Sequence, residues 1–326
     1  MSKLNKLTTL LSTTPIKAYT AAQLRHVAKL VGANSSTGTK AELVTGILSV
    51  VRQVKENDDK TSVKSNRVLS IDMGVANLAY CTFEHSLLPV GSPLPVIREW
   101  NRVSLVHDAE SNAKPTMQFS APNLAQTAVK LVNDLVLSKP KELQPCHVLI
   151  ERQRWRTMGG PRVLEWTIRV NTLEAMLWAI LSSVQTQGIW KGQVHAIDPG
   201  RISGWWLETG VKNDTKASKK YAALKLAKVD LVRTWLKEGS HVVSGSPDCE
   251  KVLQALDLNA ADRRKGSRAK KIENEHIGKL DDLADCMLQG VTFLKWLENR
   301  KRIVQKGQEG VEELLETKEQ SKTTYG

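Results

Sequence analysis

The chain has 326 residues and a formal net charge of +13, with 41% hydrophobic and 25% charged residues. This composition is typical of a soluble globular protein, and no stretch reaches the roughly 18–20 uninterrupted apolar residues of a membrane span. The basic excess favours a polyanionic partner such as nucleic acid, because neutralised phosphates release counterions, although a solvated positive face is the alternative. Four widely separated cysteines indicate a reducing compartment and argue against a zinc site.

Residues 18–51 predict a compact helical hairpin. Thr20 and Thr39 are candidate helix N-caps, and Gly32 separates two segments whose apolar residues repeat at helical spacing. The pattern is similar to a SAP module, a short DNA-binding helical hairpin. That resemblance implies that Lys40, at the start of the second helix, meets a DNA phosphate. A solvated lysine is the alternative.

A single α/β domain is expected over residues 67–303. Apolar runs predict five strands, and longer apolar repeats predict four helices. The expected strands are 67–72, 76–83, 96–105, 146–151 and 193–198, and the expected helices begin near Ser120 and cover 161–186, 217–238 and 279–300. Three consecutive strands followed by alternating helix and strand indicate a mixed five-stranded sheet flanked by helices.

The remaining segments are polar. Residues 52–66 have no apolar period and are expected to be a linker. The stretch between the last two predicted helices is expected to be a polar, basic loop, and residues 304–326 a charged tail that is frayed or partly helical. Residues 1–17 contain no acidic side chain and have the general character of a mitochondrial targeting segment.

Acidic residues stand where two of the predicted strands end. Asp72 ends the first strand and Glu151 the fourth, and a carboxylate there is costly unless a ligand or partner compensates it. Asp281, Asp282 and Asp285 begin the last long helix, where at about 100° per residue they share one side, opposite an apolar stripe. Ordinary first-turn acids, stabilised by the helix dipole, are the alternative for these three.

Carboxylates that converge in this way repel one another and normally require cations. Hard oxygen donors without His or Cys favour Mg²⁺ or Mn²⁺. Two such ions about 4 Å apart can hold a phosphodiester, activate the attacking water and stabilise the leaving 3′-oxygen. The sequence contains no glycine-rich P-loop, GxSxG elbow or HExxH motif that would favour a different reaction.

Basic residues lie close to these acids in the sequence. Three arginines alternate directly after Glu151, so that in an extended chain they share one face, which suits phosphate contacts. Two further basic runs precede the last long helix and are expected to follow a DNA backbone, although a solvated face is the usual explanation of such runs. The candidate DNA-contacting residues are Lys40, Arg152, Arg154, Arg156, Lys219, Lys220, Arg263, Arg264 and Lys265. For Trp155, Trp205 and Trp206, packing is favoured over stacking on a nucleobase.

Three segments, VLSIDMGVANLAY, VLIERQRWR and KLDDLAD, resemble the catalytic motifs of RuvC-like Holliday-junction resolvases of the RNase H superfamily. They are most similar to the fungal mitochondrial branch. The resemblance implies an RNase H-like fold, a mitochondrial homodimer and paired, symmetric nicks in four-way DNA junctions. It also implies two metal ions held by Asp72, Glu151, Asp282 and Asp285, with Asp281 as the alternative to Asp282.

Three other functions remain open at this point. One is a different RNase H-fold nuclease that acts on RNA–DNA hybrids or structured RNA, and another is a basic DNA-binding protein without activity. The third is a phosphotransferase of the actin or sugar-kinase type. This last class requires a second domain with glycine-rich nucleotide loops, and the sequence offers no such unit.

Overall fold

The chain divides into two compact units. The larger unit comprises Ser65–Ser86 and Pro93–Val291, and the smaller unit comprises Met1–Lys64, Leu87–Ser92 and Thr292–Gly326. The computed structural model describes residues 19–33, 38–58, 66–75, 77–85, 93–105, 120–153, 165–206, 217–264 and 280–323.

The larger unit is built on a six-stranded sheet in the order β5-β4-β1-β2-β3-β6. Strand β2 is antiparallel to both β1 and β3, whereas β4 is parallel to β1 and β5 is parallel to β4. The strands are β1 (Asn66–Asp72), β2 (Leu78–His85), β3 (Val96–Val103), β4 (His147–Glu151), β5 (Gln193–Ile197) and β6 (Val243–Ser244). The expected mixed sheet flanked by helices is therefore confirmed. Strand β6 was not predicted, because a pair of residues is too short to show an alternating pattern.

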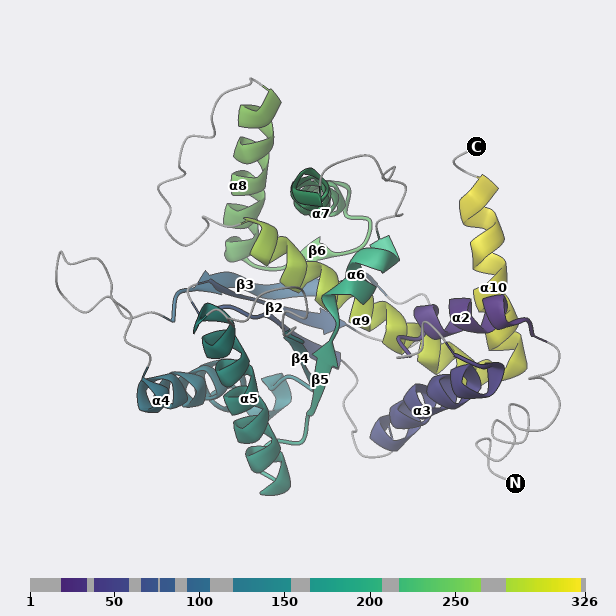
Figure 1. Cartoon of the computed structure of the whole chain (residues 1–326), viewed down its shortest axis with the longest axis horizontal. Helices are drawn as coiled ribbons and strands as arrows, with labels where there is room; N and C mark the ends of the chain where they lie inside the picture. The colour runs from purple at the N-terminus through teal and green to yellow at the C-terminus, as the bar shows by residue number, and fades with distance from the viewer. Residues whose placement is uncertain are drawn as a thin grey trace. The chain divides into compact units, whose positions relative to one another are not determined.

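Helices cover both faces of this sheet. Figure 1 shows α4 and α5 on one side and α7, α8 and the first part of α9 on the other. The helical elements are α4 (Ala121–Val132), its π-helical continuation η2 (Asn133–Leu137), the 3-10 turn η3 (Lys141–Leu143), α5 (Glu165–Thr186), α6 (Pro199–Trp206), α7 (Ala217–Glu238), α8 (Pro247–Arg264) and α9 (Leu280–Lys306). The prediction of a loop between α7 and α9 was wrong. Among the described side chains of α8, the core residues include Val252, Ala255 and Leu256, and they stand among charged residues of both signs, so the apolar period of this helix is weak in the sequence.

The core of the larger unit determines where the strand ends lie. Val170, Leu173 and Leu177 recur at helical spacing and bury α5 against the sheet. On the opposite face, Gln289 of α9 donates hydrogen bonds to the Ser70 hydroxyl (3.0 Å) and to the Ile71 carbonyl (3.2 Å) of β1. Gly290 lies beside them, and a Cβ there would overlap the Phe83 ring. Helix α9 is thereby held closely against the centre of the sheet.

The smaller unit combines helices from both ends of the chain. It contains α2 (Ala21–Leu30), α3 (Lys40–Asp58), the part of α9 after Val291, and α10 (Gln308–Thr323). The expected N-caps are confirmed, because Thr20 with Gln23 and Thr39 with Glu42 form reciprocal capping boxes. Within the described ranges, none of the helices in either unit has the length and apolar character that crossing a bilayer demands.

Two expectations for the ends of the chain differ from the structure. Helix α3 continues to Asp58, so the first part of the expected linker, 52–66, is helical. The expected tail, 304–326, contains α10, in agreement with the partly helical alternative, but it is packed, because Val311 and Leu314 are buried in the same core as the α2–α3 hairpin. The apolar period of α10 is short and lies among charged residues, which is why it resembles a solvated tail in the sequence.

Helix α9 also closes the C-terminal end of α2. Asn299 donates a hydrogen bond to the Leu30 carbonyl (2.8 Å), and Arg300 donates one to the Val31 carbonyl (2.7 Å). Gly32 follows with φ of +66°, and any Cβ at this position would overlap the Trp296 ring. The carbonyl groups that a helix leaves without partners are thus satisfied by side chains from the other end of the chain.

Candidate active site

The acidic residues singled out by the sequence lie near one another at one edge of the sheet. Strands β1 and β4 are parallel neighbours with Ile71 opposite Ile150, so Asp72 and Glu151 leave the sheet side by side. Helix α9 packs on β1 one turn after Asp285, through Gln289. The sheet register and this helix contact together bring distant parts of the sequence to one place.

Asp72 is the buried centre of this cluster, with only 9% of its surface exposed. Burial raises the pKa of its carboxyl group well above the ordinary value. A hydrogen bond with the Glu151 side chain and the negative charges of Glu151, Asp285 and Asp282 raise this pKa further. The site therefore favours the protonated carboxyl group, or a carboxylate with a cation beside it.

Two lysines of α7 face the acidic turn of α9. The Lys228 ammonium lies 2.6 Å from Asp285 Oδ1, and Lys225 pairs with Asp281. Burial raises the pKa of Asp285, Lys228 opposes that rise, and Glu151 and Asp281 add to it. The sequence did not single out Lys228, because its burial depends on the packing of α7 beside α9. In the sequence it is one of many lysines at helical spacing.

Another carboxylate approaches the site from α5. Glu174 accepts a hydrogen bond from the Gln153 backbone N–H at 3.1 Å and lies close to both Arg152 and Glu151. Burial raises its pKa, while the Gln153 N–H and the Arg152 charge oppose the rise. The sequence analysis missed this residue. Its one available signal is that it is an isolated acid among the apolar residues of a long helix.

The structure describes the side chains of only some of the predicted DNA-contacting residues. Arg152 is exposed directly after Glu151, and Lys40 is exposed at the first position of α3 in the smaller unit. Arg154, Arg156 and Lys265 lie outside the described residues, as does Trp155. The structure describes only the backbone of the four remaining candidates, which belong to α7 (Lys219 and Lys220) and to α8 (Arg263 and Arg264). Trp206 packs edge-on against Trp235 with ring centroids 4.4 Å apart, in agreement with the packing interpretation.

In the parts of the chain that the structure describes, no three His, Cys, Asp or Glu side chains are arranged so as to enclose a metal ion. In this arrangement Asp281 and Asp285 of α9 pair with lysines, and Asp72 is hydrogen-bonded to the Glu151 side chain. Asp282 and Asp285 act electrostatically on Asp72, whereas Asp281 pairs with Lys225.

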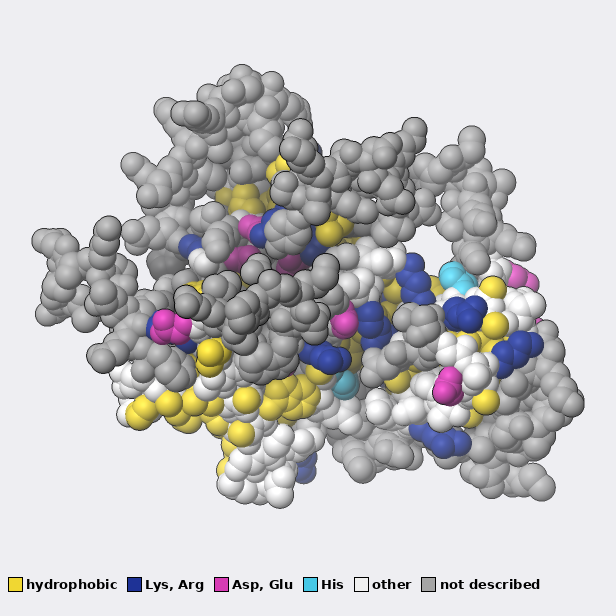
Figure 2. Space-filling model, in the orientation of Figure 1, with side chains coloured by type: hydrophobic (Ala, Val, Ile, Leu, Met, Phe, Trp, Pro, Cys, Tyr) yellow, Lys and Arg dark blue, Asp and Glu magenta, His cyan; other side chains and the backbone are white. Residues whose placement is uncertain are grey.

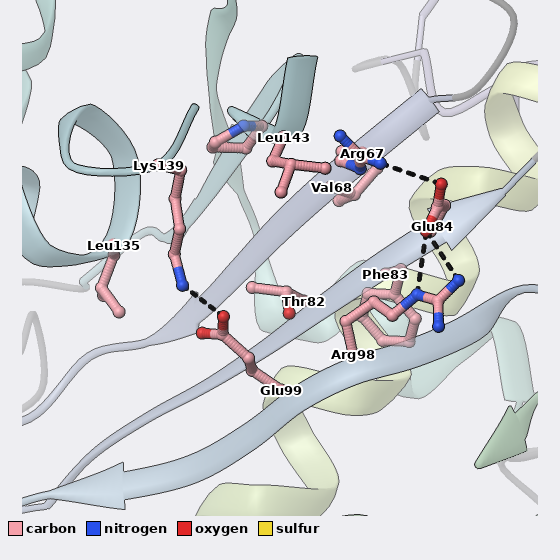
Figure 3. A pocket seen from close by; sticks show the side chains of 11 residues that line it. Arg67, Val68, Thr82, Phe83, Glu84, Arg98, Glu99, Leu135, Lys139 and Leu143 are labelled. Atoms are coloured by element: carbon pink, nitrogen blue, oxygen red, sulfur yellow. Dashed lines mark hydrogen bonds and ion pairs between the residues drawn. The ribbon is translucent and has the colours of Figure 1, made fainter. Parts of the chain in front are cut away.

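A cavity of about 410 Å³ lies at the opposite end of the same strands (Figure 3). Its charged side chains pair with one another. Glu84 contacts Arg67 at 3.0 Å and Arg98 at 2.8 Å, and Lys139 pairs with Glu99. The cavity is lined by the first residues of β1 and the last of β2, whereas Asp72 is the last residue of β1. It is therefore separate from the acidic cluster.

The strand order, the helices on both faces and the acids at the ends of β1 and β4 define a protein of RNase H-like fold. The chain belongs to the family described as mitochondrial resolvase Ydc2 / RNA splicing MRS1, whose model matches residues 68–303. The family and the fold implied by the three sequence motifs are thereby confirmed.

Individual relatives agree with this assignment. The chain is 26% identical over 330 residues to "Cruciform cutting endonuclease 1, mitochondrial" of Saccharomyces cerevisiae, covering 93% of this chain and 87% of the relative. It is 27% identical over 277 residues to the protein of the same name from Schizosaccharomyces pombe, covering 84% and 90%. The crystal structure of the yeast mitochondrial Holliday junction resolvase Ydc2 aligns with a TM-score of 0.52 at 24% identity, covering 87% of this chain and 96% of that one. This structural likeness supports the fold.

Proposed function

We propose that this chain is a mitochondrial Holliday-junction resolvase, an endonuclease that makes paired, symmetric nicks in four-way DNA junctions. The observation that carries the proposal is the convergence of Asp72, Glu151, Asp282 and Asp285 at one edge of the sheet. Such a cluster is costly to fold and has a chemical use as a cation site for phosphodiester hydrolysis. The names of the two yeast relatives, cruciform cutting endonucleases of mitochondria, support the substrate and the location.

The donor set of this cluster fits Mg²⁺ or Mn²⁺. Its members are all carboxylates, which are the hard oxygen ligands that these ions prefer, and burial makes their uncompensated charge unfavourable. We assign the ligands as Asp72, Glu151, Asp282 and Asp285, with Asp281, which pairs with Lys225, as the alternative to Asp282. Two such ions, when bound, supply a positively charged support for the phosphodiester, the attacking water and the leaving 3′-oxygen.

The chain's own residues prepare this site. Lys228 offsets the charge of Asp285 and thereby limits the repulsion that Asp285 exerts on the buried Asp72. Gln289 fixes the distance between α9 and β1. Arg152 stands exposed beside Glu151, where its guanidinium can contact a phosphate on the strand to be cut.

Symmetric nicking of two opposed strands requires two active sites, so we propose a homodimer. Figure 2 shows hydrophobic side chains along the visible surface of α4 and α5. Val129 on α4 is 54% exposed, and Ile168 on α5, on the side of the helix opposite the buried Val170, Leu173 and Leu177, is 43% exposed. A second copy of the chain is the partner that we assign to this face.

RNA is the second candidate substrate, because the family description also names RNA splicing. The cleavage of a mobile four-way DNA junction in Mg²⁺, with each strand labelled in turn, distinguishes the two functions. We expect cuts at symmetric positions in two opposed strands and little cleavage of linear duplex, RNA–DNA hybrid or structured RNA. Equal rates on all substrates would contradict junction selectivity, and preferential cleavage of the hybrid or the RNA would favour the second function.

Asp72→Asn is the matched variant for this experiment. The amide keeps the shape of the side chain but removes the charge that binds the cation, so we expect cleavage to fall by roughly 1,000-fold or more. Junction binding, measured by gel shift in EDTA, should remain close to that of the unchanged protein. Full cleavage by Asp72→Asn would remove Asp72 from the mechanism.

A further inference from the structure

The backbone directly after Glu151 is held by two hydrogen bonds of different kinds. The Arg152 N–H donates to the Ile197 carbonyl at 2.8 Å, which extends the pairing of β4 with β5 by one bond. Strand β5 ends at Ile197, and α6 begins at Pro199. The next amide, that of Gln153, finds its acceptor in the Glu174 side chain, with Oε2 at 3.1 Å. The Glu174 side chain of α5 therefore supplies the hydrogen-bond acceptor for the first backbone amide beyond the pairing of β4 with β5.

Glu174 is a rigid support for that amide. Its neighbours on α5, Val170, Leu173 and Leu177, are almost fully buried against the sheet, so the helix backbone at Glu174 is fixed. The charges of the Arg152 and Glu151 side chains both act on the Glu174 carboxylate. Glu174 thus binds the backbone that directly follows the candidate ligand Glu151 and the candidate phosphate contact Arg152, and its charge interacts with the charges of both.

We infer that Glu174 is a positioning residue of the acidic site. By accepting the Gln153 N–H, it sets the direction in which the chain leaves β4, so that Glu151 stays directed at Asp72 while Arg152 faces outward. This role rests on the proposed nuclease function and acts through Glu151, without a contact to the reacting atoms. Side chains that orient a ligand in this way typically contribute 10- to 100-fold to activity or metal affinity.

Two conservative variants distinguish the effect of the length of the Glu174 side chain from the effect of its negative charge. Glu174→Gln keeps an acceptor oxygen at the same distance from the helix but loses the negative charge. Glu174→Asp keeps the charge but is one methylene shorter and does not reach the Gln153 amide. A positioning role predicts that Gln behaves like the unchanged protein and that Asp and Ala behave alike. Thr172→Ala is the control on the same helix, because the Thr172 hydroxyl bonds to its own helix backbone, at Ile168.

Amide hydrogen exchange at Gln153 is the first readout, and it requires no nuclease activity. We expect exchange about tenfold faster in Glu174→Asp and Glu174→Ala and unchanged in Glu174→Gln and Thr172→Ala. Unchanged exchange in the Ala variant would overturn the inference. If the unchanged protein cuts no junction, the proposed function fails while this readout still decides whether Glu174 holds the turn.

Junction cleavage is the second readout. We expect kcat to fall by about 10- to 100-fold in Glu174→Asp and Glu174→Ala with a smaller change in KM, and to be restored in Glu174→Gln. A thermal unfolding midpoint within the range of the Thr172→Ala control shows that the fold is intact. An equal loss in the Gln and Ala variants would contradict positioning, because the charge and not the acceptor would then matter.

Discussion

Asp72 illustrates the energetic cost of the site at the level of a single side chain. A buried carboxylate loses hydration, and three further carboxylates nearby raise the free energy of its charged form. The raised pKa means that the folded protein binds a proton that the unfolded chain, with an ordinary Asp pKa of about 3.9, has already released. In the absence of metal, Asp72 therefore lowers the stability of the fold at neutral pH.

The sign of this effect leads to a measurable pH dependence. Below the pKa that Asp72 has in the unfolded chain, its carboxyl group is protonated in both the folded and the unfolded state and does not affect stability. As the pH rises from there toward the higher pKa of the folded state, the free energy of unfolding falls. We expect Asp72→Asn, in EDTA at pH 7–8, to unfold at a higher temperature than the unchanged protein, by about 2–4 °C for each kcal/mol relieved. Near pH 3 the two should coincide, and Mg²⁺ should stabilise only the unchanged protein. Calorimetry across this pH range measures the difference.

Asp257→Asn serves as the control of opposite sign. Slight burial raises the pKa of Asp257, but the Lys237 and Arg233 partners outweigh it and hold the pKa below its ordinary value. The loss of this carboxylate should lower stability at neutral pH. If Asp72→Asn were also destabilising in EDTA, the Asp72 charge would already be compensated inside the protein, and the cation-site argument would be contradicted.

The sequence revealed those site residues whose signal is local. Asp72 and Glu151 each follow an unbroken apolar run, and the aspartates of α9 share one side of a helix, so a linear pattern identifies them. Lys228 and Glu174 carry no comparable pattern. Their partners, Asp285 and the Gln153 amide, come from other elements, and only the packing of α7 on α9 and of α5 beside β4 brings them into contact.

At the level of elements, the α2–α3 hairpin depends on helices distant in sequence. A helix as short as α2, of 10 residues, is marginal on its own in water, even with its capping box. Asn299 and Arg300 bind its C-terminal carbonyls, and Ile303, Val311 and Leu314 complete its apolar core. The caps and the hairpin could be predicted because they are local. That α9 and α10 cover the hairpin could not be predicted, because nothing in the hairpin specifies what covers it.

Leu314→Ala tests this dependence. Leu314 is 2% exposed in the core shared with α2 and α3, so its truncation should cost about 2–5 kcal/mol in the free energy of unfolding of the smaller unit. Urea unfolding followed by amide exchange in α2 and α3 measures the loss. Leu226→Ala, at a position 44% exposed on α7, is the control and should change little. Equal stability of the two variants would mean that the hairpin does not need α10.

At the level of the whole molecule, the exposed apolar side chains of α4 and α5 are the surface to which we assign the proposed homodimer. The sheet covers the buried stripe of α5 but leaves Ile168, on the opposite side of that helix, 43% exposed, and Val129 of α4 is 54% exposed. Large apolar residues grouped on adjacent helices mark an interaction surface more often than scattered ones do. The sequence showed the breadth of the α5 stripe, but only the fold shows which part of it remains uncovered.

Ile168→Asp should separate the subunits. A charge placed at the centre of an apolar interface costs several kcal/mol per copy, and in a twofold dimer it occurs in both copies. If the proposed homodimer forms through this surface, analytical ultracentrifugation should find a dimer for the unchanged protein and a monomer for Ile168→Asp. Junctions should then receive single nicks in place of paired ones. Leu226→Asp is the control at a similarly exposed leucine on α7, and a persistent dimer in Ile168→Asp would place the interface elsewhere.

The smaller unit, assembled from both ends of the chain, has a consequence for biosynthesis. A ribosome adds about 5–20 residues per second, so α2 and α3 emerge roughly tens of seconds before Ile303, Val311 and Leu314 exist. During that interval the apolar side of the hairpin lacks its covering helices and is a surface to which chaperones can bind. Completion of this unit must follow translation, and a nascent chain that stalls before α9 leaves its first folded element unfinished.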